Sequence, residues 1–115
     1  MKKIALFLAV MLVSTSASAQ YFRDRTIVGA GVFYKGTNSI LFVEIDGDKS
    51  AMTECATSKR FAIDSSMPNY KEIVSFVMAA YMKRENKVEL LTDTKCTKWG
   101  NAQDILGIKV GNMAF

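Results

Sequence analysis

Cysteine is the residue type in this 115-residue chain whose positions say most about chemistry. The chain has two cysteines, Cys55 and Cys96, and no histidine. The usual histidine sites for zinc and haem are therefore excluded, as are nucleophiles activated by histidine. A redox pair would normally be spaced Cys-x-x-Cys, whereas these two lie far apart in the sequence. We expect no metal site and no cofactor.

Two other groups of residues invite a catalytic interpretation, and each has a simpler one. Asp46 and Asp48 could serve as acid and base, but they flank a glycine, and Asp-Gly turn chemistry accounts for both. Ser65 and Ser66 have no neighbouring base and are followed by Pro68, which makes them helix-entry residues. We therefore expect a binding or structural protein and not an enzyme.

Aromatic residues beside polar ones are the best candidates for ligand contact. Sugar sites stack an aromatic face on the sugar ring and hydrogen-bond its hydroxyls from nearby polar groups. Trp99 lies in a polar segment and Tyr34 precedes a lysine, so each side chain either contacts a ligand or plugs an end of the domain. Lys59 and Arg60 form either a ligand clamp or a solvated basic pair.

The first 19 residues have the pattern of a cleaved secretory signal peptide. Lys2 and Lys3 give a positive start, an apolar run covers residues 4–13, and Ala17-Ser18-Ala19 is a small-x-small cleavage site. The apolar run is too short to span a bilayer, and no later segment is long and apolar enough to do so. We expect export to the periplasm or beyond, and a single mature domain of residues 20–115.

Export changes what the cysteines and the charge imply. In an oxidising compartment Cys55 and Cys96 are expected to form one disulfide, and its loop of about 40 residues contributes roughly 4 kcal/mol to stability. Cleavage removes Lys2 and Lys3, so the formal charge falls from +4 to +2. A charge this small implies neither a nucleic acid nor an anionic membrane as partner.

Turn signals and apolar spacing divide the mature chain into five strands and one helix. Gly29 and Gly31 lie in the first strand, where they favour a bend or a close backbone approach. This order of elements predicts a mainly β OB-fold, a five-stranded, partly open barrel with the helix between strands three and four. The expected strands are residues 26–34, 39–46, 49–58 with an extension through 61–63, 87–94 and 104–110, and the expected helix is about 69–84.

The expected helix is amphipathic. Ile73, Val77 and Tyr81 recur on one face, and Asn69 with Glu72 fits a capping box at its start. Such a face either plugs an open barrel or lines the channel of an oligomer, and the spacing does not choose between them.

Three short runs carry a resemblance to a known family. Cys55-Ala56-Thr57-Ser58-Lys59, the helix after it and the strand start at residues 87–90 resemble the B subunits of subtilase-cytotoxin and typhoid-toxin type. The run at residues 92–95 is similar to one in enterotoxin B subunits. The resemblance implies a secreted, disulfide-bonded OB module that forms a homopentamer, binds cell-surface glycans and associates with a toxin A chain.

The same resemblance points to further ligand residues. Typhoid-type relatives carry Tyr-Tyr-Ser-Asp before the first strand, and the matching residues here are Tyr21-Phe22-Arg23-Asp24. Tyr21 and Asp24 match, whereas Arg23 replaces the serine and offers a bidentate partner for a carboxylate. The candidate ligand residues are Tyr21, Arg23, Asp24, Tyr34, Lys59 and Trp99.

Two functional hypotheses follow. The first is a glycan-recognising module like a toxin B subunit. The alternative is a solitary periplasmic OB-fold protein with an envelope-stress, structural or protein-inhibitor role. A ring predicts about five times the protomer mass in solution and a solitary module predicts one protomer mass, so a mass measurement separates them.

Overall fold

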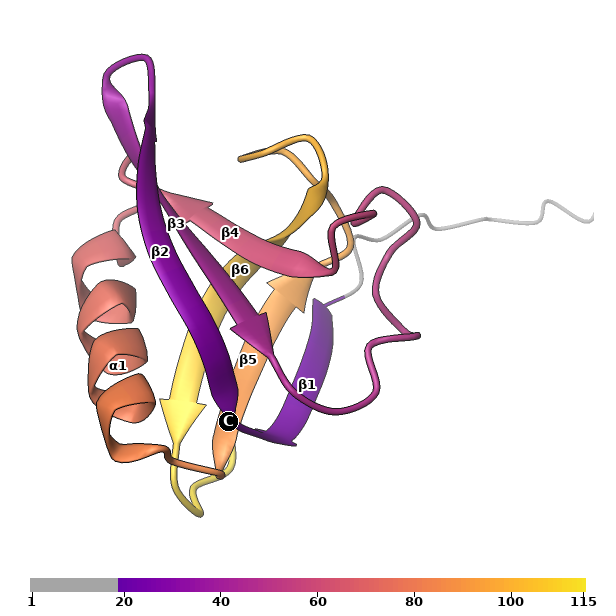
Figure 1. Cartoon of the computed structure of the whole chain (residues 1–115), viewed down its shortest axis with the longest axis vertical. Coiled ribbons are helices and arrows are strands. Elements are labelled where there is room, and N and C mark those ends of the chain that lie inside the picture. The colour runs from indigo at the N-terminus through magenta and orange to yellow at the C-terminus, as the bar shows by residue number, and fades with distance from the viewer. Residues whose placement is uncertain (1–18) are drawn as a thin grey trace, which may run out of the picture.

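The computed structural model describes residues 19–115. All of the predicted signal peptide except its last residue, Ala19, lies outside the described residues. Six strands and one helix make up the domain (Figure 1). In chain order they are β1 (Ala19–Arg25), β2 (Ile27–Lys35), β3 (Asn38–Ile45), β4 (Arg60–Asp64), α1 (Tyr70–Lys83), β5 (Val88–Asp93) and β6 (Ala102–Val110).

The strands form one sheet in the order β1-β5-β6-β4-β3-β2. Neighbouring strands are antiparallel except β4 and β6, which are parallel. The two edge strands, β1 and β2, are consecutive in the chain and joined at Thr26, so the sheet curls round without being closed by strand pairing. Helix α1 packs against β2 and β6 on one side of the sheet (Figure 1). The predicted mainly β fold, with one helix before the last two strands, is confirmed.

A strand precedes the first expected one, and each of the two has one register shift. Residues 19–25, which the sequence left outside the strands, form β1 and add a sixth strand. The register shifts between Phe22 and Arg25, where Asp24 has a left-handed φ of 55°, and again between Ile27 and Gly29. The irregularity expected near the strand glycines is confirmed at Gly29. The charged run after Phe22 hid the β1 alternation, in which only the phenylalanine is buried.

The expected strand at residues 49–58 is wrong. That segment is a series of turns, with backbone bonds from Met52 N to Lys49 O at 3.1 Å and from Ala56 N to Thr53 O at 3.0 Å. Met52 and Ala56 are buried, but Glu54 between them is exposed, so the segment lacks the continuous alternation of a half-buried strand. Only the expected extension forms a strand, as β4, with Phe61 and Ile63 buried.

Helix α1 is confirmed to within a residue of the expected bounds, but its cap is not the expected one. Asn69 is the N-cap residue and makes no side-chain capping bond within the described chain. Its Nδ2 donates instead to Leu106 O at 3.0 Å, so the asparagine ties the helix start to β6. Ile73, Val77 and Ala80 form the buried stripe that packs on the sheet.

Candidate functional site

The candidate ligand residues fall into two groups on different parts of the sheet. Strands β1 and β2 are the two edge strands of the sheet, and each group of residues has members on one of these strands. The sequence therefore pointed to two separate surfaces. The first group lies on β1 and consists of Tyr21, Arg23 and Asp24; the second contains Tyr34 on β2, Lys59 before β4 and Trp99 before β6.

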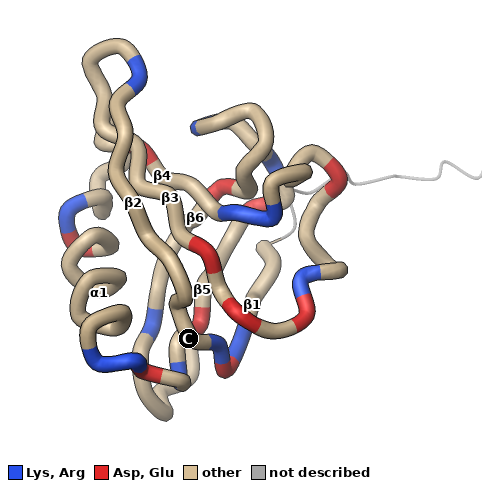
Figure 2. The backbone as a smooth tube through the Cα atoms, in the orientation of Figure 1, with Lys and Arg blue, Asp and Glu red and all other residues tan. Residues whose placement is uncertain are grey.

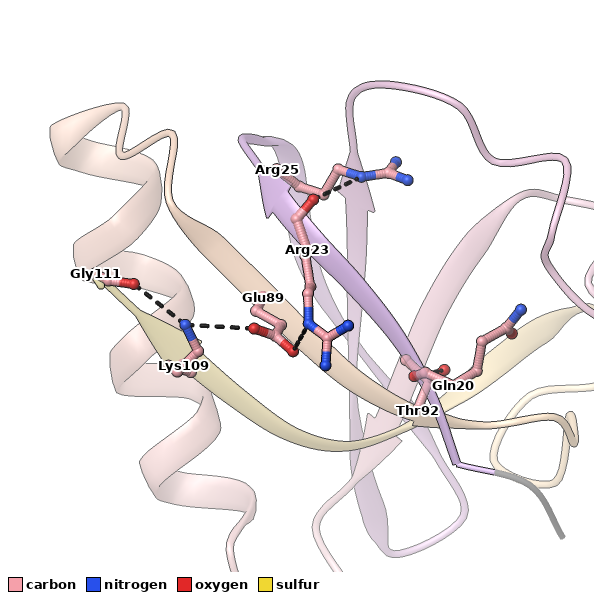
Figure 3. A network of polar contacts seen from close by, with 7 residues as sticks. All are labelled: Gln20, Arg23, Arg25, Glu89, Thr92, Lys109 and Gly111. Carbon is pink, nitrogen blue, oxygen red and sulfur yellow. Dashed lines mark hydrogen bonds and ion pairs between the residues drawn. The ribbon is translucent and has the colours of Figure 1, made fainter. Parts of the chain in front are cut away.

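On β1, Arg23 reaches from solvent to a buried acid (Figure 3). Its Nε donates to Glu89 Oε2 at 2.9 Å, and the two side chains are 64% and 6% exposed. Lys109 Nζ lies 3.3 Å from Glu89 Oε1 and donates to Gly111 O at 3.2 Å, so the buried carboxylate has two cations. The Arg23 guanidinium also lies 4.6 Å over the Tyr21 ring. Within residues 19–115 Arg23 donates through Nε alone, so its terminal nitrogens remain available for a ligand.

Asp24 does not join this network. Its side chain is 76% exposed, and the cation paired with it is Lys87, whose Nζ lies 3.9 Å away. Surface pairs of this kind contribute little to stability. Asp24 is therefore an exposed carboxylate next to Arg23 in the chain, with Lys87 as a weakly held partner.

Arg25 connects β1 to the loop after β3. Its guanidinium donates to Asp46 O and Asp48 O, each at 2.8 Å, which fixes the path of the turn between them. Gly47 in that turn has a φ of 84°, and a Cβ there would lie 2.9 Å from Arg25 Nη1, so any other residue would strain the backbone and push the guanidinium away. The backbone N–H of Ser50, which donates to Asp48 Oδ1 at 2.9 Å, lowers the pKa of the Asp48 carboxyl.

The second group surrounds a groove on the outer face of β2, β3 and β4. Phe33 stacks on Tyr34 at 5.5 Å between ring centroids, and Trp99 meets Phe33 edge-on at 5.8 Å and Phe42 edge-on at 5.2 Å. The hollow beside these rings has a volume of about 430 Å³. We call it the aromatic groove; it is lined by Gly29, Ala30, Gly31, Val32, Phe33, Phe42, Val43, Glu44, Arg60 and Trp99.

The strand glycines leave this space open. Gly29 pairs with Glu44 and Gly31 pairs with Phe42 across the β2–β3 ladder, so all four positions share one face. A Cβ built on Gly31 meets no described atom within 4 Å. The missing side chains on β2 therefore create the hollow between Phe33 and Phe42.

Arg60, not Lys59, is the cation of the groove. Lys59 is exposed at a left-handed φ of 58° in the turn before β4 and lies beside the lining (Figure 2 shows the basic stretch where β4 begins). The Arg60 guanidinium stacks 4.5 Å over the Phe42 ring, and its Nη2 donates to Asn101 Oδ1 at 3.2 Å. Its Nε is buried and has no partner among the described residues. The sequence would have pointed to Arg60 if the strand had been predicted to start there, because Arg60 and Ala62 then lie on the strand face that points away from the core.

Trp99 combines the two interpretations that the sequence left open. It packs with Phe42 onto a small cluster of buried residues on this face, Ile40, Ala62 and Ala102. Its ring also forms part of the groove lining. Tyr34 is 71% exposed, so it covers no core and lies at the end of the groove against Phe33.

Two sets of contacts fix the loop that carries Trp99. The predicted disulfide between Cys55 and Cys96 is confirmed, with a Cα–Cα distance of 6.1 Å. The buried carboxylate of Asp104 accepts hydrogen bonds from Thr97 N at 2.8 Å and from Lys98 N at 3.2 Å.

The far side of this loop rests on the turn before β4. Asn101 O accepts the Ser58 hydroxyl at 2.6 Å and the Ser58 backbone N–H at 3.2 Å. The loop is thus held at both ends, and the ring of Trp99 is positioned before any ligand arrives.

No helix within residues 19–115 is both long and apolar enough to cross a membrane. Across the same residues, no group of three or more Cys, Asp or Glu side chains is placed to hold a metal ion.

Comparison with known proteins gives a fold match without a sequence match. No protein-family model matches the chain, and no curated protein matches it. A mutant of the Salmonella typhi PltB homopentamer, solved with Neu5Ac-α-2-3-Gal-β-1-4-GlcNAc glycans, has a TM-score of 0.61 at 12% identity, over 82% of this chain and 86% of that one. A second mutant of that homopentamer has a TM-score of 0.57, with the same identity and coverage. The chain therefore has an OB-fold like that of toxin B subunits.

Proposed function

We propose that this chain is an exported, non-catalytic binding subunit that recognises cell-surface glycans and works as a homopentamer. The observation that carries the proposal is the fold shared with the PltB homopentamer, which was solved with glycans bound. The match covers most of both chains, so it concerns the whole domain and not one motif.

The exposed face of α1 supports assembly. Met78 and Met82 are half or more exposed, one turn apart on the side of the helix opposite the buried stripe. Apolar side chains gathered on one exposed helix face are typical of subunit contacts. In the proposed ring this face of α1 lines the channel between protomers.

The Cys55–Cys96 disulfide supports export, because such bonds persist in oxidising compartments. On β1, Arg23 supports glycan recognition, since its terminal nitrogens are free to pair with a carboxylate while its Nε is held by Glu89. Tyr21 beneath the guanidinium supplies an aromatic face, and Asp24 supplies a hydrogen-bond acceptor. We assign these three residues to a glycan site on the outside of the ring, and a toxin A chain to the channel.

The test is light scattering of the oxidised mature protein as it elutes from a sizing column, followed by a glycan array. The proposal expects about five protomer masses and binding to a restricted set of glycans. A monomer that binds no glycan would contradict it and favour a solitary periplasmic OB-fold protein.

A further inference from the structure

We propose that the aromatic groove is a saccharide site in its own right, separate from the β1 residues, and that it takes a sugar ring carrying a carboxylate. This inference rests on the proposed glycan-binding function and names a site that the family resemblance does not assign. It concerns the surface formed by Gly31, Phe33, Phe42, Arg60 and Trp99.

The shape of the groove suits a sugar ring. Phe33 and Phe42 meet Trp99 at nearly perpendicular angles, 86° in each case, so aromatic surfaces bound the hollow from different directions. The C–H face of a pyranose packs on such surfaces while its hydroxyls point towards solvent and polar groups. The volume of about 430 Å³ lies at the small end of the range for ligand pockets, which fits one or two sugar rings.

The charges at the groove favour an anionic sugar. Arg60 has five N–H donors, and the structure records one side-chain bond for it, to Asn101. No acidic side chain among residues 19–115 forms an ion pair with Arg60. Glu44, which the β3–β4 register places beside Arg60, pairs instead with Lys49 at 3.5 Å. Lys35 Nζ lies 5.8 Å over the Trp99 ring and adds a second cation. A carboxylate on the sugar would complement this uncompensated positive charge.

The groove is also held rigidly, which favours ligand binding. The disulfide, the Asp104 hydrogen bonds and the bonds from Ser58 fix the Trp99 loop on β4. Little side-chain entropy is therefore lost when a ligand binds.

Gly31 offers a variant that blocks the groove without disturbing the fold. Since a Cβ at Gly31 meets no described atom within 4 Å, Gly31→Leu can be attached without a clash at Cβ, and the rest of its side chain extends into the hollow. Gly100→Leu is the matched control, because Gly100 is equally open and does not line the groove. Arg60→Gln removes the charge, and Tyr21→Ala tests the β1 site separately.

The assay is calorimetric titration with Neu5Ac-α-2-3-Gal-β-1-4-GlcNAc and its neutral counterpart Gal-β-1-4-GlcNAc, with light scattering of every variant. We expect the wild type and Gly100→Leu to bind the acidic trisaccharide alike at the groove, and Gly31→Leu to bind it there at least about tenfold more weakly while the β1 site is unchanged. Arg60→Gln should lose about ten- to a hundredfold for the acidic sugar and leave any binding of the neutral one unchanged.

Two results would overturn the inference alone, and a third would overturn the proposed function as well. If Gly31→Leu and Arg60→Gln bind like the wild type while Tyr21→Ala does not bind, the groove is no glycan site, although the protein remains a glycan binder. If Gly31→Leu changes the solution mass and leaves binding per protomer unchanged, the groove is a subunit contact. If the wild type binds neither the trisaccharide nor the neutral disaccharide and no glycan on an array, the proposed function fails together with this site.

Discussion

Replacing both Cys55 and Cys96 with serine is expected to lower the free energy of unfolding by about 4 kcal/mol. The cross-link joins residues 41 positions apart, and closing a loop of that length removes about 13 cal/mol/K of entropy from the unfolded chain. Cys55 is exposed and Cys96 only half-buried, so the serines remove little packing and the loss comes from the cross-link. For a domain of this size the melting temperature should fall by about 16–30 °C.

The chain provides its own reporter for this measurement. Trp99 is the single tryptophan and lies three residues after Cys96, so its fluorescence follows the loop that the disulfide holds. Urea unfolding of the double variant would be compared with that of the wild type before and after reduction, and the reduced wild type should match the variant. A loss below about 1 kcal/mol would refute the chain-entropy reasoning, since the loop would then be constrained in the unfolded state without the bond.

Three further substitutions test the packing around the two surfaces, each by urea unfolding against the wild type. Lys109→Met should lower the free energy of unfolding by about 3 kcal/mol, because it leaves the buried Glu89 with one exposed cation. Adding Glu89→Leu should recover most of that loss. If it recovers none, the buried charge is not the cause. Gly47→Ala should cost about 1–2 kcal/mol, because φ is 84° and the new Cβ would lie 2.9 Å from a guanidinium nitrogen; an unchanged midpoint would contradict this. Asp104→Ala should cost about 2 kcal/mol and shift Trp99 fluorescence towards that of a solvated ring, whereas an unshifted spectrum would mean that the disulfide and the Ser58 bonds hold the loop without Asp104.

Local patterns were sufficient for several features. The helical spacing of Ile73 and Val77 placed α1, and the β2–β3 hairpin followed from alternating strands around a glycine turn. The disulfide was predictable because the chain has two cysteines. The segment at residues 49–58 was not predictable in this way, since its buried Met52 and Ala56 are held by turns whose hydrogen bonds leave no regular alternation in the sequence.

The candidate site depended much more on tertiary structure. The sequence singled out Lys59, but the start of β4 at Arg60 decides which of the two basic residues faces the groove, because neighbouring residues in a strand point to opposite faces. Phe33 and Phe42 were not singled out, since a strand with one buried face does not show which outward-facing aromatics will meet.

The sequence by itself determined the composition of the domain: short strands, one amphipathic helix between the third and fourth expected strands, two cysteines and no histidine. These features depend on residues a few positions apart, whose spacing fixes local hydrogen bonding and burial. Only the tertiary structure decided that Tyr21 and Trp99 belong to different surfaces, and that Arg60 stacks on Phe42 beside Trp99. Those contacts join residues far apart in the chain, and strand register, the bend in the first strand and the path of the Trp99 loop set them together.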